Sequence, residues 1–331
     1  MRNQRGVALI TVMLVLAIVV LLATQMSGRL IMQLQRTENI QLNQQAFWYA
    51  MGAEALAKRV LSEEQKSNPD VTHLSQMWAQ GSNRYPVDNG EIAGEIHDLH
   101  ACLNLNALRI NPANNNSGGP IKKLPARETL ERLVTNLEVE GVSEFEAEYM
   151  ADSLTDWLDR DDSIVSAGGA EDNDYGAKEF PYNAANHFMA SLQELRVVEH
   201  FSVPVIQALK PYVCVIPATS LHKININTIA DENGKLLAAL LDVSEDQASD
   251  ILAARGEKGF ETVNDFLAIP EMAQLKLTDE QKQQFVVDSE YFKLTASAEF
   301  NQSYFNLNSI LKVSDEDNIT VVSRTIGRLN E

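Results

Sequence analysis

An uncharged apolar segment near the N-terminus constrains this chain more than any other feature. No Asp, Glu, Lys or Arg occurs from Gly6 to Gly28, and most of these residues are large and apolar. A helix of about 20 apolar residues is long enough to cross a bilayer. Arg2 and Arg5 precede the segment, so the positive-inside tendency predicts a cytoplasmic N-terminus. The chain after Arg29 is then expected outside the cytoplasm, in a periplasm where the cell has one.

Three interpretations of this segment compete. A secretory signal peptide has a shorter apolar core and a small-x-small cleavage site, which Ala23–Ser27 matches poorly. A plain signal anchor is the simplest alternative. We favour the third, because the basic segment of residues 1–6 ends in Gly6 directly before the apolar run and resembles the leader cut by prepilin peptidases. Such a cut exposes Val7 as a new N-terminus and leaves residues 7–28 as the transmembrane part of a helix.

The fifth residue after that cut is Thr11. In the pilin family this position is usually Glu, which pairs with the N-terminal amine of a neighbouring subunit during assembly. A buried carboxylate is costly without a positive partner. A subunit at the tip of a filament has no neighbour beyond it, so Thr at this position suits a tip subunit. Neutral drift is the alternative explanation.

The N-terminal helix is expected to continue far beyond the membrane. From Gln25 onward apolar residues recur at roughly helical spacing, and the first strong break is Asn68-Pro69. A helix from Val7 to about Glu64 would be ~85 Å long. Such a helix would cross the bilayer and project a head domain.

Three segments with β-strand character predict a small antiparallel sheet packed on this helix. They are residues 90–102, 291–298 and 319–326. The sequence therefore predicts an α+β, pilin-like fold. In it, residues 29–103 supply the rest of the helix and the first strands, and residues 289–331 supply the C-terminal strands.

Residues 104–288 are helical in pattern and too long to be a loop of that sheet. The motif Leu103–Leu108 recurs at Ile224–Ile229, and a third short copy is Phe305–Ile310. An Asn before an apolar-periodic stretch is a good helix N-cap. We therefore predict an inserted all-helical domain of two related units, 104–211 and 218–288.

The second unit contains Ala254–Phe260, which resembles a helix-hairpin-helix. That module often contacts DNA backbones through Gly amides and Lys. The alternative is a packing module of the sterile-alpha-motif type. We favour packing because carboxylates flank the segment and the formal net charge of the chain is −19, which opposes phosphate binding. Nucleic acid is not expected as a partner.

Two acidic clusters, Asp156–Asp162 and Gly168–Tyr175, flank a Gly-containing loop in the first unit. Closely spaced like charges repel unless a cation neutralises them. Hard oxygen ligands on a flexible loop suit calcium, which takes about six to eight oxygens. The ligand spacing does not match an EF-hand, and a solvated acidic surface is the alternative. We expect one or two structural calcium ions, with ligands drawn first from Asp159, Asp161, Glu171 and Asp174 and then from Asp162, Asp172 and Asn186.

The remaining reactive side chains point to no chemistry of their own. Cys102 and Cys214 are the only cysteines, and they could form a disulfide in an oxidising compartment or remain buried thiols. The six His residues are scattered, and no metalloprotease helix, Walker loop or nucleophile elbow occurs. We therefore do not expect an enzyme.

These features together resemble the K-type minor pseudopilin family of type II secretion systems. The resemblance rests on the leader ending at Gly6, the absent mature Glu, the helical insertion and a set of short motifs. The motifs are Asp-Trp-Leu-Asp-Arg-Asp at 156–161, Gly-Ala-Glu-Asp at 169–172, Pro181-Tyr182, Asn186 and Glu194-Leu195-Arg196. The resemblance covers nearly the whole chain.

The resemblance implies a subunit that initiates and caps the pseudopilus, the filament that exports folded proteins across the outer membrane. It implies calcium in the helical domain and a complex with I-, J- and H-type minor pseudopilins and the major pseudopilin. It also implies processing by a prepilin peptidase. The protein would be a single-pass inner-membrane protein of a Gram-negative bacterium, with a cytoplasmic N-terminus and a periplasmic C-terminal domain.

Two alternatives remain open at this stage. One is a type IV pilus or competence-type minor pilin, or a DNA receptor that uses the helix-hairpin-helix-like segment. The other is a membrane-anchored periplasmic calcium-binding protein without a role in a filament.

Overall fold

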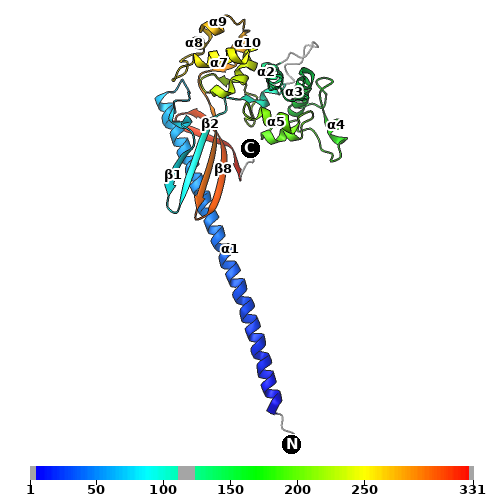
Figure 1. Cartoon of the computed structure of the whole chain (residues 1–331), viewed down its shortest axis with the longest axis vertical. Coiled ribbons are helices and arrows are strands. Elements are labelled where there is room, and N and C mark those ends of the chain that lie inside the picture. Colours follow the sequence, from blue (N-terminus) through cyan, green and yellow to red (C-terminus); the bar gives the residue numbers. More distant parts are fainter. Residues whose placement is uncertain (1–4, 111–123, 328–331) are drawn as a thin grey trace.

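A single long helix carries the rest of the molecule (Figure 1). The computed structural model describes residues 5–110 and 124–327, so the first four residues of the predicted leader lie outside it. Helix α1 spans Arg5–Ser67 and ends directly before Asn68-Pro69, as the sequence predicts. Within the described chain, this is the one helix apolar and long enough to cross a membrane. Its apolar segment is exposed along its length.

The head of the molecule contains a five-stranded antiparallel sheet in the order β1-β2-β7-β8-β9. All three predicted β segments contribute strands, while β1 and β8 were not expected. The third copy of the Asn motif does not begin a helix, because it runs through the middle of β8. The strands are β1 Asn83–Val87, β2 Gly90–Asp98, β7 Tyr291–Phe300, β8 Ser303–Asp315 and β9 Asn318–Ile326.

Small side chains bring the C-terminal half of α1 close to this sheet. Ala50, Ala53 and Ala57 pack against buried apolar residues of β7 and β8. Glu54 is also buried there and accepts hydrogen bonds from Arg324 of β9 at 2.9 Å and from Ser309 of β8 at 2.6 Å. A buried carboxylate with such partners fixes the register of helix against sheet. The predicted pilin-like core is confirmed.

A mainly helical domain is inserted between β2 and β7 and lies at the end of the head that is distant from the N-terminus (Figure 1). The prediction of an all-helical insertion is wrong in one respect, because two short parallel strand pairs close its two units. Its apolar residues form one continuous cluster that includes both predicted units. The first unit comprises β3 Leu103–Asn104, α2 Pro125–Asn136, α3 Glu144–Leu158, α4 Asp172–Gly176, α5 Val203–Leu209 and β4 Val213–Cys214. The second comprises β5 Ile224–Asn225, α6 Gly234–Leu241, α7 Glu245–Ala253, α8 Val263–Leu267, α9 Pro270–Ala273, α10 Asp279–Gln283 and β6 Phe285–Val286. Short 3-10 helices complete the chain: η1 Met77–Ala79, η2 Leu105–Leu108, η4 Leu192–Arg196 and η5 Asp231–Asn233.

The repeated Asn motif has the same structural role in both units. Asn106 donates to the carbonyl of Met189 at 3.0 Å and accepts from its N–H at 2.8 Å. Asn227 binds Phe260 in the same way, at 3.0 and 2.7 Å. Each amide side chain thus pairs with the backbone of a distant loop. The strand before it pairs in parallel with the last strand of its own unit, β3 with β4 and β5 with β6.

Candidate metal centre

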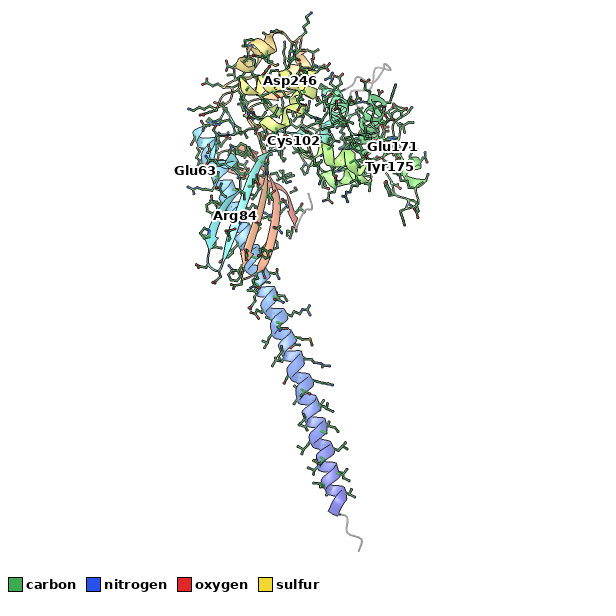
Figure 2. All side chains as sticks on the ribbon, viewed as in Figure 1. Glu63, Arg84, Cys102, Glu171, Tyr175 and Asp246 are labelled. Atoms are coloured by element: carbon green, nitrogen blue, oxygen red, sulfur yellow. A yellow bond between two sulfur atoms is a disulfide. The ribbon has the colours of Figure 1, made fainter. Side chains whose placement is uncertain are left out.

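The acidic segment surrounds the C-terminal end of α3. Ser143 and Glu146 cap the start of this helix, and the N–H of Ser143 donates to the Glu146 carboxylate at 2.9 Å. The helix ends at Leu158, with Asp159 as its C-cap residue. The chain then loops back along α3 before α4 begins. Glu171 and Tyr175 lie on the side of the helical domain that faces away from the sheet (Figure 2).

Aromatic side chains order the chain beyond this loop. Tyr175 is fully buried, with its ring 5.2 Å from Trp157 and stacked on Tyr182 at 5.2 Å. Its hydroxyl accepts from the N–H of Glu199 at 3.3 Å, and burial raises the pKa of Tyr175 above its ordinary value. The Tyr182 hydroxyl donates to the carbonyl of Val197 at 2.7 Å. These contacts show why the acidic segment is ordered here.

Glu171 is the most unusual side chain of the predicted ligand set. It is 3% exposed, and neither carboxylate oxygen has a hydrogen-bond partner in the described chain. Burial, followed by the negative charges of Asp156 and Asp159, raises the pKa of Glu171 to about 8. Asp159 is 5% exposed, and burial together with the charge of Asp161 raises its pKa to about 6. No positive charge stabilises Glu171 as a buried carboxylate requires, whereas the charge of Arg109 partly offsets the rise in the pKa of Asp159.

Two further predicted ligands face each other across the site. Asn186 donates from Nδ2 to the Asp162 carboxylate at 3.2 Å. Its backbone has a φ of 47°, and its side-chain oxygen is buried without a partner among the described residues. An amide oxygen left unpaired beside carboxylates is a suitable additional ligand for a hard cation.

Three predicted ligands use their carboxylates differently. Asp161 accepts from the N–H of Ser163 at 3.0 Å, and Asp174 accepts from the N–H of Glu171 at 3.0 Å. Asp172 accepts from the N–H of Ala184 at 2.9 Å and from the side chain of Asn183 at 3.0 Å. In residues 5–110 and 124–327, no three His, Cys, Asp or Glu side chains converge as a ligand cluster. Asp159 also accepts from the N–H of Asp161, at 3.3 Å. Of the seven predicted ligands, Glu171 and Asn186 are therefore the two with buried oxygen atoms that have no partner among the described residues.

Two carboxylates that the sequence did not single out as site residues tie the loop to α3. Asp156 is fully buried and accepts from the N–H groups of Val165 and Ala170, both at 2.9 Å. Asp152 is fully buried as well, and it binds Arg127 and the hydroxyl of Ser166. The helical spacing of four residues between these two carboxylates is the only sequence signal for their shared role.

The arrangement is chemically suited to a hard divalent cation. The candidate oxygen donors come from Asp159, Asp162, Glu171 and Asn186. The negative charges of Asp159 and Asp162 act on Glu171, and the positive charge of Arg109 acts on Asp159. A cation bound there would neutralise the unpaired Glu171 carboxylate and would do no chemistry. By donor type, although not as a converged ligand cluster among the described residues, the residues present fit calcium.

The other predicted sites lie at the membrane end and at the base of the insertion. Val7 is exposed on α1, which includes Gly6. The hydroxyl of Thr11 donates to the carbonyl of Ala8 at 2.9 Å, so this position needs no partner outside its own helix. Cys102 and Cys214 form a disulfide with a Cα–Cα distance of 5.8 Å, between the sheet and the first helical unit (Figure 2).

Arg255 of the helix-hairpin-helix-like segment is bonded within the chain, while Glu257 and Lys258 are exposed. Arg255 donates to the carbonyl of Ile229 at 2.5 Å and to Asp231 at 2.7 Å. A Cβ at Gly259 would lie 2.4 Å from Asn227, whose amide is already bound to the Phe260 backbone. These contacts account for the Gly and Arg of the motif as packing residues, which favours the packing module over the DNA receptor.

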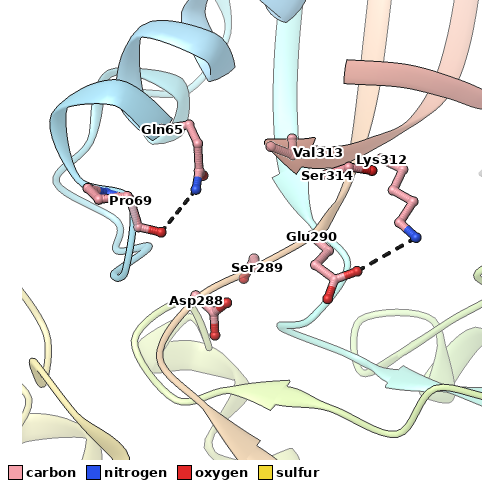
Figure 3. A pocket seen from close by; sticks show the side chains of 8 residues that line it. All are labelled: Gln65, Pro69, Asp288, Ser289, Glu290, Lys312, Val313 and Ser314. Atoms are coloured by element: carbon pink, nitrogen blue, oxygen red, sulfur yellow. Dashed lines mark hydrogen bonds and ion pairs between the residues drawn. The ribbon is translucent and has the colours of Figure 1, made fainter. Parts of the chain in front are cut away.

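A polar cleft that the sequence did not predict separates the end of α1 from the sheet (Figure 3). Its volume is about 340 Å³. Three of its lining side chains have partners within the lining itself, because Gln65 donates to the carbonyl of Pro69 at 2.9 Å and Lys312 pairs with Glu290 at 3.9 Å. Ser289, also in the lining, donates to the buried Asp98 at 2.6 Å. The cleft is thus part of the joint between pilin core and insertion.

Comparison with known proteins gives one consistent family. The family models described as type II secretion system (T2SS), protein K, match residues 101–218 and 224–288. Type II secretion system protein K of Aeromonas hydrophila is 38% identical, with 98% of each chain covered. That of Pectobacterium carotovorum subsp. carotovorum is 33% identical over 98% of this chain and 97% of the relative.

A solved structure agrees with these sequence relatives. It is a chain of the GspK-GspI-GspJ complex from the enterotoxigenic Escherichia coli type 2 secretion system, with 34% identity and a TM-score of 0.78. The match covers 89% of this chain and all of that chain (100%). At this identity and coverage, the chain belongs to the type II secretion system protein K family, the K-type minor pseudopilins.

Proposed function

We propose that this minor pseudopilin sits at the tip of the pseudopilus, where it initiates and caps the filament that moves folded proteins across the outer membrane. The observation that carries this proposal is the position of the inserted domain. It occupies the end of the head farthest from the apolar N-terminal segment of α1, where a further subunit stacked above would meet it (Figure 1). Thr11 supports the same position, because its hydroxyl is satisfied within α1 and demands no neighbour.

The proposed partners are other pilin-type subunits. The similar solved chain was crystallised in a GspK-GspI-GspJ complex, and we infer equivalent I- and J-type partners for this chain. H-type minor pseudopilin and the major pseudopilin would follow below them. The apolar segment of α1 would anchor the protein in the inner membrane before assembly, with residues 1–6 cytoplasmic and the head periplasmic. A periplasmic head is consistent with the Cys102–Cys214 disulfide.

Processing at Gly6 is tested by mass spectrometry of the native N-terminus. We expect a chain that begins at methylated Val7, as the prepilin leader implies. The Gly6→Leu variant should retain Met1 and fail to co-purify with I- and J-type partners. Gly28→Ala is the matched control, because a Cβ there meets nothing within 4 Å. A wild-type chain that keeps Met1, or that lacks the apolar segment, would contradict the filament assignment.

We also propose that one or two calcium ions order the acidic loop without taking part in any chemistry. The support is the unpaired, buried carboxylate of Glu171 beside Asp159 and the Asp162–Asn186 pair. Calorimetry on the full chain in detergent should detect calcium binding that Asp159→Ala with Glu171→Ala abolishes. Asp246→Ala with Glu257→Ala removes the same charge from exposed positions of the second unit and should leave binding intact. Undiminished binding in the first double variant would refute the site.

A further inference from the structure

We propose that Asp156 is a positioning residue that holds the loop Arg160–Ala170 in its cation-binding form before any cation arrives. This inference rests on the proposed calcium site and concerns a residue outside the predicted ligand set. The loop connects Asp159 and Glu171, so its shape decides whether these two carboxylates can serve one ion.

The first argument is the way in which Asp156 is used. Its two oxygens accept from N–H groups at two points of the loop, Val165 with Oδ1 and Ala170 with Oδ2, both at 2.9 Å. A carboxylate is the one side chain of this size that offers acceptors on both branches. Because Asp156 lies on the rigid helix α3 and is fully buried, these two bonds fix the middle and the end of the loop against that helix.

A second attachment of the loop to α3 lies one helical turn before Asp156. Asp152 binds the hydroxyl of Ser166, which in turn accepts from the N–H of Gly168 at 3.0 Å. Arg127 provides the positive partner of Asp152. The carboxylate of Asp152 therefore binds the loop while Arg127 neutralises its charge. Asp156 binds the loop only by accepting from backbone N–H groups.

The third argument is the lack of space where the loop approaches α3. A Cβ at Gly169 would lie 2.1 Å from Oδ2 of Asp156, and a Cβ at Gly168 would lie 2.2 Å from the ring of Tyr149. Only glycine permits this approach at both positions. The sequence Gly168-Gly169 is thus explained by the contact with Asp156 and Tyr149 rather than by flexibility.

The contrast with Glu171 separates two roles within one acidic cluster. Both oxygens of Asp156 are occupied by backbone donors, whereas both oxygens of Glu171 have no partner in the described residues. Loop positioning is thus assigned to Asp156 and cation binding to Glu171. Positioning groups behind ligands typically change metal affinity by about 10–100-fold when removed.

Hydrogen exchange of the full chain in detergent with EDTA tests the proposal directly. The Val165 and Ala170 amides, resolved by fragmentation of peptides from residues 160–171, should be protected in the wild type without calcium. Asp156→Asn replaces one acceptor by a donor, so it should remove protection and weaken calcium binding by about 10–100-fold. Glu171→Gln should abolish tight calcium binding and leave both amides protected. Unprotected wild-type amides in EDTA would overturn the proposal.

Two glycine variants keep the test independent of the carboxylates. Gly169→Ala should reproduce the exchange behaviour of Asp156→Asn, whereas Gly176→Ala, where a Cβ meets nothing within 4 Å, should not. Protection in α6 and α7 reports whether each variant is folded. If Asp156→Asn itself fails to fold, Gly169→Ala decides. Protected amides in a wild type that binds no calcium would refute the calcium site and leave the role of Asp156 standing.

Discussion

The first and second helical units begin and end alike and differ in what lies between. In both, the first two-residue strand pairs in parallel with the last strand of the unit. The second Asn of the repeated motif, Asn106 or Asn227, binds a backbone segment far along the chain. In the second unit that segment follows a short hairpin whose Arg255 is satisfied internally. In the first, it follows a long acidic loop in which Glu171 has no partner among the described residues. The paired strands and the bound Asn residues are common to both units and define their fold. The segments between them differ, and the candidate site lies in the acidic loop of the first unit.

The largest expected difference between the units comes from the disulfide. Cys102 and Cys214 close a loop with a sequence separation of 112 around the first unit, and the second unit has no cysteine. Replacing both by Ser should lower the free energy of unfolding by about 4–5 kcal/mol. The disulfide closes a long loop, so its removal gives the unfolded chain a large amount of conformational entropy. Urea unfolding followed by tryptophan fluorescence measures this.

The control for the disulfide is the wild-type protein unfolded in the presence of a reductant. Reduction should reproduce the destabilisation of the double Ser variant, because it removes the same cross-link without changing side-chain volume. A loss below about 1 kcal/mol in both cases would show that the frame of the first unit does not depend on the cross-link.

A smaller effect tests whether the two Asn residues are equivalent. Asn106→Ala or Asn227→Ala leaves buried backbone groups of Met189 or Phe260 without a partner. Each should cost about 2–4 kcal/mol, because every stranded buried group costs about 1–3 kcal/mol. Asn106 should cost more, since it also donates to the carbonyl of Ile216 at 2.9 Å.

The third copy of the motif supplies the matched control. Asn308 is the equivalent of Asn106 and Asn227 in the third copy and lies within β8, where its side-chain oxygen has no hydrogen-bond partner among the described residues. Asn308→Ala should change the free energy of unfolding by less than about 1 kcal/mol, because no distant backbone N–H loses an acceptor. Equal losses at all three positions would mean that the motif acts through local propensity and not through its distant partners.

The sequence predicts the frame of this protein better than its details. The uncharged run, the break at Asn68-Pro69 and the repeated motif are local signals, so the long helix and the inserted helical domain could be predicted. Strand β1 was missed because Arg84, Tyr85 and Pro86 are all exposed and give no alternation. In β8 the Asn pattern was taken as part of the repeat, although cross-strand pairing with β7 and β9 decides its structure.

The candidate site shows the same limit. A density of carboxylates predicts where a cation could bind, and in the structure the charge of Asp159 acts on Glu171. It does not reveal which carboxylates are used by backbone donors. Asp161 and Asp174 bind N–H groups within three residues of themselves, a local competition common for Asp. Asp156 is bonded nine and fourteen residues away, which only the fold can show.

The smallest expected effect is a dependence of stability on pH that arises from Glu171 in the first unit. Burial raises the pKa of Glu171 from its ordinary 4.5 to about 8, so without metal the folded state binds more protons than the unfolded chain between these values. Stability must therefore fall as pH rises through this window. With EDTA, the melting temperature should be a few degrees higher at pH 5.5 than at pH 8. Saturating calcium should reduce or reverse this difference, because it competes with protons for the same oxygens. Glu171→Gln should reduce the dependence in EDTA without abolishing it, because burial also raises the pKa of Asp156 to about 7 and that of Asp159 to about 6. An unchanged slope in that variant would assign the effect to other groups.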